Sequence, residues 1–211
     1  MTVWALKDPA EYPDYVAYVK KSLDAGESRF GWGYLPTADL RTLSKRPWHE
    51  LTEKEKECLK RSRFLLDIHR GDWVVHINIP SYNLCTAAQV SGEYRFQLDE
   101  KVGDFGHCLP IDLSTTVVFL RNDPSIDPRV SQNLKPRQRF QRVSFVAEFL
   151  EAMSNLKEGK VSLEASERKG TVFLKKGLEP HVKQIAELIH QKHPGKALEY
   201  FLKDYLKSSP V

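Results

Sequence analysis

The chain has 211 residues, of which 41% are hydrophobic and 28% charged, a composition typical of a globular protein of one or two domains. No run of about 18 apolar residues occurs, so the sequence predicts no membrane partner. The first residues soon reach acids and prolines, unlike a secretory signal, and the three cysteines lack metal-binding spacing. We therefore expect reduced, mostly buried cysteines and a cytoplasmic location.

The first half of the chain predicts helices separated by a loop. Apolar residues at helical spacing predict a helix over residues 13–23, and a short helix is expected from Thr37 to before Pro47. A longer helix is predicted over residues 52–66, because Thr52 followed three residues later by glutamate forms a capping box.

The middle of the chain predicts β-structure. Strands are expected over residues 71–80 and 84–96, one or two more over 107–121 with an interruption at Pro110, and residues 139–145 form a last strand or lead into a helix. Short strands with turn signals about every ten residues favour a small barrel or curled sheet over βαβ units. The expected fold class is therefore α+β.

The composition changes after about Phe145, where helical patterns follow. Residues 179–192 and 195–207 each form an amphipathic helical pattern. We predict a domain over residues 1–148 and a helical appendage or linker over residues 149–211.

Positive charge is concentrated in two segments. Residues 129–142 hold five basic residues and no acid, and residues 60–64 form a second basic cluster. Such clusters suit a surface that follows phosphates, although a solvated face explains them equally well. The residues predicted to bind phosphate are Arg41, Lys45, Lys135, Arg137, Arg139 and Arg142.

Aromatic residues in loops provide the second functional signal. Trp32 stands between glycines, which would allow a flat ligand to approach its ring, whereas the alternative is that it packs in the core. Proteins that read an extruded base stack it on aromatic faces and contact its edge with polar groups. The predicted cage residues are Trp32, Tyr34, Tyr82, Tyr94 and Phe105, and the polar residues expected at the base edge are Asn78, Ser81 and Asn83.

Four segments within residues 1–145 carry a family resemblance, and they are, in order, ESRFGWGYLPTADLRTL, IHRGDWVVHINIP, AAQVSGEYRF and HCLPIDL. Together they resemble the EVE and YTH branches of the PUA-like superfamily. The resemblance implies a curled barrel of five or six strands with flanking helices, which binds a modified base in an aromatic cage with Trp32 as its first wall. Our leading hypothesis takes double-stranded DNA as the ligand. The expected role is that of a specificity domain in a McrB-type restriction or defence system, with an effector nuclease or NTPase as partner.

Two other functions remain open. A metal-dependent nuclease or nucleotide-processing enzyme would use His76, His107 and the acids Asp99, Glu100 and Asp104. A protein–protein adaptor would dock through the helices at residues 180–207. The sequence contains no recognisable catalytic motif, so we assign no catalytic residue, metal or cofactor.

Overall fold

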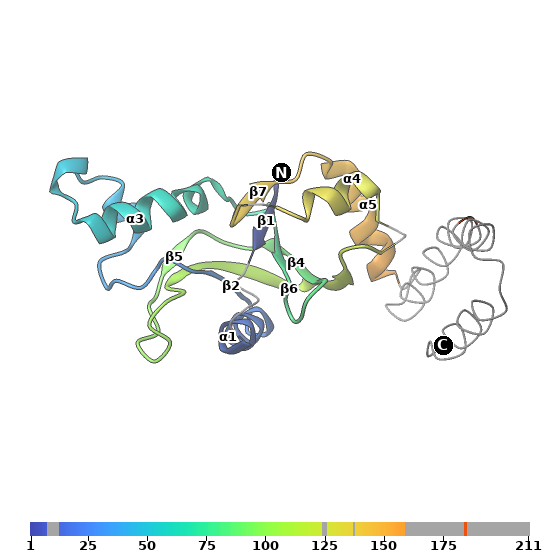
Figure 1. Ribbon diagram of the computed structural model, residues 1–211, viewed down its shortest axis with the longest axis horizontal. Coiled ribbons are helices and arrows are strands. Elements are labelled where there is room, and N and C mark those ends of the chain that lie inside the picture. The colour runs from blue at the N-terminus through green and yellow to red at the C-terminus, as the bar shows by residue number, and fades with distance from the viewer. Residues whose placement is uncertain (8–12, 124–125, 137, 159–183, 185–211) are drawn as a thin grey trace, which may run out of the picture. The chain divides into compact units, whose positions relative to one another are not determined.

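The computed structural model describes residues 1–7, 13–123, 126–136, 138–158 and 184 (Figure 1). The chain divides into two units, Met1–Ser166 and Glu167–Val211, and the account below concerns the first. Apart from Gln184, which is helical, the helices predicted at 179–192 and 195–207 lie outside the described residues. The predicted boundary after residue 148 falls within a helix and stays a prediction.

The described part of the chain contains both strands and helices. The strands are β1 (Val3–Lys7), β2 (Glu27–Phe30), β3 (Trp73–Ile77), β4 (Leu84–Val90), β5 (Arg95–Phe96), β6 (His107–Leu120) and β7 (Phe140–Arg142). The helices are α1 (Pro13–Asp24), α2 (Leu40–Leu43), α3 (Glu53–Ser62), α4 (Pro128–Asn133) and α5 (Val146–Lys157), with short 3₁₀ helices η1 (Trp48–Glu50) and η2 (Arg63–Asp67).

The strands form one mixed sheet in the order β2-β6-β4-β3-β1-β7, and β5 pairs with β6 (Figure 1). β1 is parallel to β3, whereas the remaining pairings are antiparallel. Ser28 of β2 and His76 of β3 form a buried hydrogen bond of 2.8 Å, although β6 and β4 lie between these strands in the sheet. The sheet is therefore strongly curled into a half-barrel, which confirms the expected α+β class and curled sheet with flanking helices.

Hydrophobic cores pack on both faces of the sheet, and successive residues of a strand point to opposite faces. In β1, Trp4 and Leu6 belong to the core on the concave face, whereas Val3 and Ala5 belong to the core on the convex face. The convex core includes Trp73, whose ring packs edge-on against Phe149 of α5 with centroids 5.7 Å apart.

The two edge strands of the half-barrel, β2 and β7, do not pair with each other, and side chains fill the gap between them. Phe64 of η2 packs edge-on against Phe30 of β2 at 5.2 Å and stacks on Phe140 of β7 at 3.6 Å. Aromatic packing rather than a hydrogen-bond ladder thus closes this side, which we call the seam.

Several local predictions are confirmed. α1 coincides with the predicted helix, and both hydrogen bonds of the capping box are present at the start of α3. All three cysteines are buried and free. In the described residues, no helix is long and apolar enough to cross a membrane.

Three elements were not predicted, and one was predicted in a different form. The sequence indicated neither β1, β2 nor α4, which are four to six residues long. Residues 107–120 form one continuous strand, although an interruption was expected at Pro110. Its first half pairs with β2 and β5 and its second half with β4, so the strand changes partners where Pro110 was expected to break it.

Candidate nucleic-acid interface

A hollow of about 650 Å³ opens along the seam. Its described lining residues are Lys7, Trp32, Lys60, Arg61, Gln138, Arg139 and Phe140. We call this cavity the seam hollow. A volume of this size falls within the range of small-molecule and nucleotide pockets.

Four separate segments supply the lining. Lys7 ends β1, and its N–H donates to the carbonyl of Arg139 at 2.7 Å, which brings β7 alongside. Trp32 follows β2, and Lys60 and Arg61 lie in the last turn of α3. The two basic segments of the sequence, residues 60–64 and 129–142, therefore contribute to one surface.

The electrostatics of the seam hollow favour an anion. Its described lining residues carry four positive charges and no carboxylate. Lys60 and Arg61 are exposed, so their charges remain accessible to a ligand. The Arg61 guanidinium lies over the Trp32 ring, with 5.1 Å between its central carbon and the ring centroid. The arrangement combines phosphate-binding cations with an aromatic face, as nucleic-acid sites do.

The backbone around Trp32 is held in an uncommon conformation. Trp32 has φ +71°, in the left-handed region that costs a non-glycine residue free energy. Asp104 fixes the loop, because its Oδ1 accepts from the N–H of Gly33 at 2.9 Å and of Phe105 at 2.7 Å. Burial raises the pKa of Asp104, and these backbone hydrogen bonds oppose that rise.

Close backbone contact explains the second glycine of the Gly-Trp-Gly step. A Cβ on Gly33 would lie 2.7 Å from the Gly106 nitrogen, and one on Gly106 would lie 2.6 Å from the Gly33 oxygen. The loops at residues 31–33 and 104–106 therefore need glycine where they touch. This contact and Asp104 together hold the backbone on either side of Trp32.

The other predicted cage aromatics occupy different environments. Tyr94 and Phe105 are buried, 4% and 2% exposed, and Tyr94 shares a hydrogen bond of 2.8 Å with His107 Nδ1. Tyr34 packs partly buried against the concave core, and its hydroxyl lies 3.5 Å from Glu57. The structure does not gather these three residues around the seam hollow.

Tyr82 and the predicted base-edge residues lie in the turn between β3 and β4. Asn78 Oδ1 accepts from the Asn83 N–H at 3.3 Å, and Asn83 Oδ1 accepts from Arg121 at 2.6 Å. The carbonyl of the exposed Ser81 accepts from the N–H that begins β4. Asn78 and Asn83 are thus engaged in holding the turn.

The predicted phosphate-binding residues are similarly dispersed. Of these, Arg139 lines the seam hollow, whereas Arg137 lies outside the described residues. Arg41 pairs with Asp39 at 2.7 Å, and Arg142 lies over the Trp4 ring at 4.6 Å. The remaining two, Lys45 and Lys135, are exposed.

The structure therefore joins Trp32 and Arg139, which were predicted on separate grounds, and adds residues that sequence reasoning did not select. Lys60 and Arg61 were visible as a basic cluster within a predicted helix, and that cluster was the available signal. Lys7 and Phe140 had no comparable signal, because their place depends on the pairing of β1 with β7.

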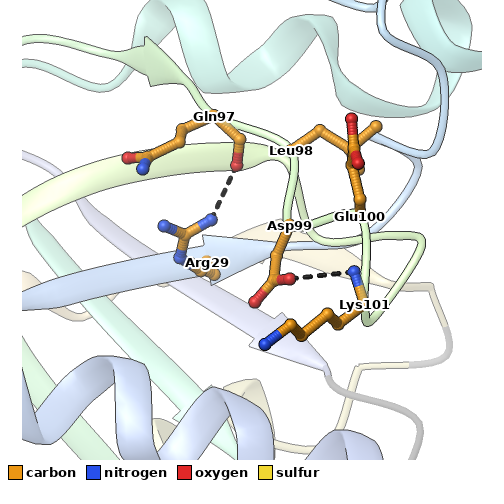
Figure 2. Close-up of a pocket in the computed structure, with 6 residues that line it drawn as sticks. All are labelled: Arg29, Gln97, Leu98, Asp99, Glu100 and Lys101. Atoms are coloured by element: carbon orange, nitrogen blue, oxygen red, sulfur yellow. Dashed lines mark hydrogen bonds between the residues drawn. The ribbon is translucent and has the colours of Figure 1, made fainter.

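The acids predicted for the enzymatic alternative do not form one site. Asp99 and Glu100 line a second hollow of about 360 Å³ with Arg29, and Asp99 Oδ1 accepts from the Lys101 N–H at 3.0 Å (Figure 2). Asp104 instead holds the Trp32 loop. Among the described residues, no group of three His, Cys, Asp or Glu side chains is placed to hold a metal ion.

Comparisons with protein-family models, curated proteins and solved structures find no significant match to this chain. What the structure shows is a mixed, strongly curled half-barrel with flanking helices, and the relationship to the PUA-like superfamily stays a prediction.

Proposed function

We propose that this chain is a nucleic-acid-binding module that reads a modified base, most simply a methylated base in double-stranded DNA, as the specificity part of a restriction or defence system. The base would be extruded from the duplex into the seam hollow. An effector nuclease or NTPase would act on the DNA so marked.

One observation carries the proposal: two basic segments distant in the sequence meet around a partly exposed tryptophan in a single hollow. Lysine and arginine at this density bind successive phosphates and position a duplex without reading its sequence. An aromatic face gives the hollow a means to hold a base, and such stacking contributes about 1–3 kcal/mol per base.

The strained backbone at Trp32 supports a functional reading of that residue. A left-handed, non-glycine conformation persists only where the surroundings enforce it, and such positions cluster at binding sites. Here Asp104 and the Gly33–Gly106 contact enforce it. With the backbone of this loop held in place before binding, less conformational freedom is lost when a base stacks on Trp32.

Binding titrations of the full chain with matched short duplexes test the proposal. The duplexes are unmodified or carry N6-methyladenine, 5-methylcytosine or 5-hydroxymethylcytosine, and each is measured at two salt concentrations. We expect a preference for one modification, and salt-sensitive binding to all of them.

Two variants distinguish recognition of the base from binding of the phosphates. Trp32→Gly removes the ring while suiting the positive φ, and it should abolish the preference but keep most salt-sensitive binding. Lys60→Ala with Arg139→Ala should weaken binding to every duplex and reduce the salt slope by about 2. Lys54→Ala, on the exposed face of α3 outside the seam hollow, is the matched control. Equal affinity for all duplexes would rule out base reading, and no binding would rule out the proposal.

A further inference from the structure

The most exposed of the large hydrophobic side chains in the described structure is in the turn between β3 and β4. Tyr82 is 72% exposed and belongs to neither core. Its turn is nevertheless well held, because Ser81 O accepts from the Leu84 N–H at 3.0 Å and Thr86 Oγ1 donates to Ile79 O at 2.9 Å. A rigid turn thus presents an aromatic ring to solvent.

A cation accompanies this ring. The guanidinium carbon of Arg121 lies 5.8 Å from the Tyr82 ring centroid. Arg121 is anchored from the other side, because its Nη2 donates to Asn83 Oδ1 at 2.6 Å. This anchor is a neutral amide, so the contact orients the guanidinium without cancelling its charge.

The turn and the seam hollow both begin where the neighbouring strands β1 and β3 end. β1 and β3 are parallel, and their last residues, Lys7 and Ile77, are register partners. Lys7 lines the seam hollow, and Ile77 leads directly into the turn. Ile79 of the turn also belongs to the core against which Trp32 packs. A polymer bound along these strand ends would contact both the seam hollow and the turn that carries Tyr82.

We propose that Tyr82 stacks on a base of the same nucleic acid that the seam hollow binds, with Arg121 on the adjoining phosphate. This inference rests on the proposed function and deepens it, because it assigns the second contact of the duplex. A ring inserted beside a base step occupies space that an extruded base leaves and offsets the lost stacking. The predicted edge-reading residues Asn78 and Asn83 then serve to present Tyr82.

The test compares affinities of full-chain variants for the duplex whose modification the wild type binds best, at two salt concentrations. Tyr82→Ala should weaken binding about 10-fold or more without changing the salt slope, because stacking releases no counterions. Tyr82→Phe should bind close to wild type, since the ring is retained. Ser81→Ala, in the same turn, is the matched control. Thermal unfolding should be the same for all four proteins, because residue 82 is exposed.

The outcomes separate the inference from the proposed function. If Tyr82→Ala binds like Ser81→Ala while Lys60→Ala with Arg139→Ala still weakens binding, the inference is wrong and the proposed function stands. If Tyr82→Ala weakens binding but Tyr82→Phe does not restore it, stacking is also excluded. If the wild-type chain binds no duplex, both proposals fall.

Discussion

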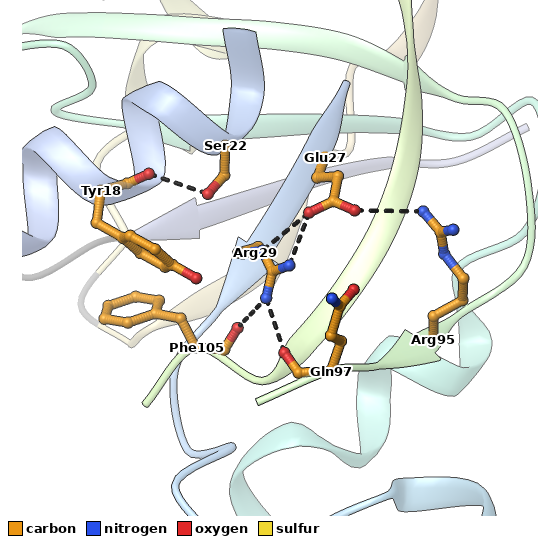
Figure 3. A network of polar contacts seen from close by, with 7 residues as sticks. All are labelled: Tyr18, Ser22, Glu27, Arg29, Arg95, Gln97 and Phe105. Carbon is orange, nitrogen blue, oxygen red and sulfur yellow. Dashed lines mark hydrogen bonds and ion pairs between the residues drawn. The ribbon is translucent and has the colours of Figure 1, made fainter. Parts of the chain in front are cut away.

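Replacing the buried Arg29 should destabilise the fold more than replacing an exposed arginine that contacts the same acid. Arg29 is 6% exposed, and its Nε and Nη2 donate to Glu27 Oε2 at 3.0 and 2.7 Å (Figure 3). Its Nη1 donates to the carbonyls of Gln97 at 2.8 Å and Phe105 at 3.2 Å. One guanidinium therefore ties β2 to both ends of the loop that holds Asp104.

Arg29→Met removes these donors but keeps a long side chain. Two carbonyls lose their partner, at about 1–3 kcal/mol for each one left unsatisfied, and Glu27 loses its bidentate partner. Breaking a buried ion pair from one side costs about 3–5 kcal/mol. Because Glu27 stays partly accessible to water, we expect a loss of about 3 kcal/mol in the free energy of unfolding, near the lower end of that range.

Arg95→Met is the matched control. Arg95 lies 3.5 Å from Glu27 Oε1 with its side chain 56% exposed, so its loss should cost less than about 1 kcal/mol. Urea unfolding followed by circular dichroism gives the free energy of unfolding of both variants, provided that its slope against urea concentration agrees with that of the wild type. Equal losses for the two variants would refute the view that burial and the carbonyl contacts make Arg29 important.

Three further predictions concern the loops and helix around the site. Gly33→Ala should lower the free energy of unfolding by about 2 kcal/mol or more, because its Cβ meets the Gly106 backbone; Gly31→Ala, whose Cβ would meet no atom closer than 3.4 Å, is the matched control, and comparable urea midpoints would contradict the clash. Burial lowers the pKa of His107 to about 4, below its usual 6.5, so its contribution to stability is complete above pH 6.5 and is lost as the pH falls towards 4. Between pH 7 and 5.5 the wild type should therefore lose about 1 kcal/mol more than His107→Gln, and parallel pH profiles would exclude this. Thr52→Ala should cost about 1 kcal/mol in urea unfolding by removing the α3 cap, and an unchanged midpoint would argue against the capping box.

Local patterns were sufficient for much of the secondary structure. The helix at residues 13–24, the capping box of α3, the strands β3 and β4 and the burial of the cysteines follow from periodicity, caps and hydrophobicity, which act between near neighbours in sequence. The curled sheet could also be predicted from the sequence, because short strands with frequent turn signals favour it.

The site depended on contacts that no local pattern records. β1 and β2 are short, and their pairing with β7, β3 and β6 spans from about 70 to about 140 residues of sequence. The same long-range pairing places Lys7 beside Arg139 and leaves the seam where Lys60 and Arg61 reach Trp32. Burial likewise separated Tyr94 and Phe105 from Trp32, although all three looked equivalent as aromatics in or beside loops.

Residue types and their spacing thus determined which segments of this protein are helical, which are extended and where positive charge is dense. Tertiary structure alone decided which cations and which aromatic ring share one hollow, because that depends on how a curled sheet brings its unpaired edges together.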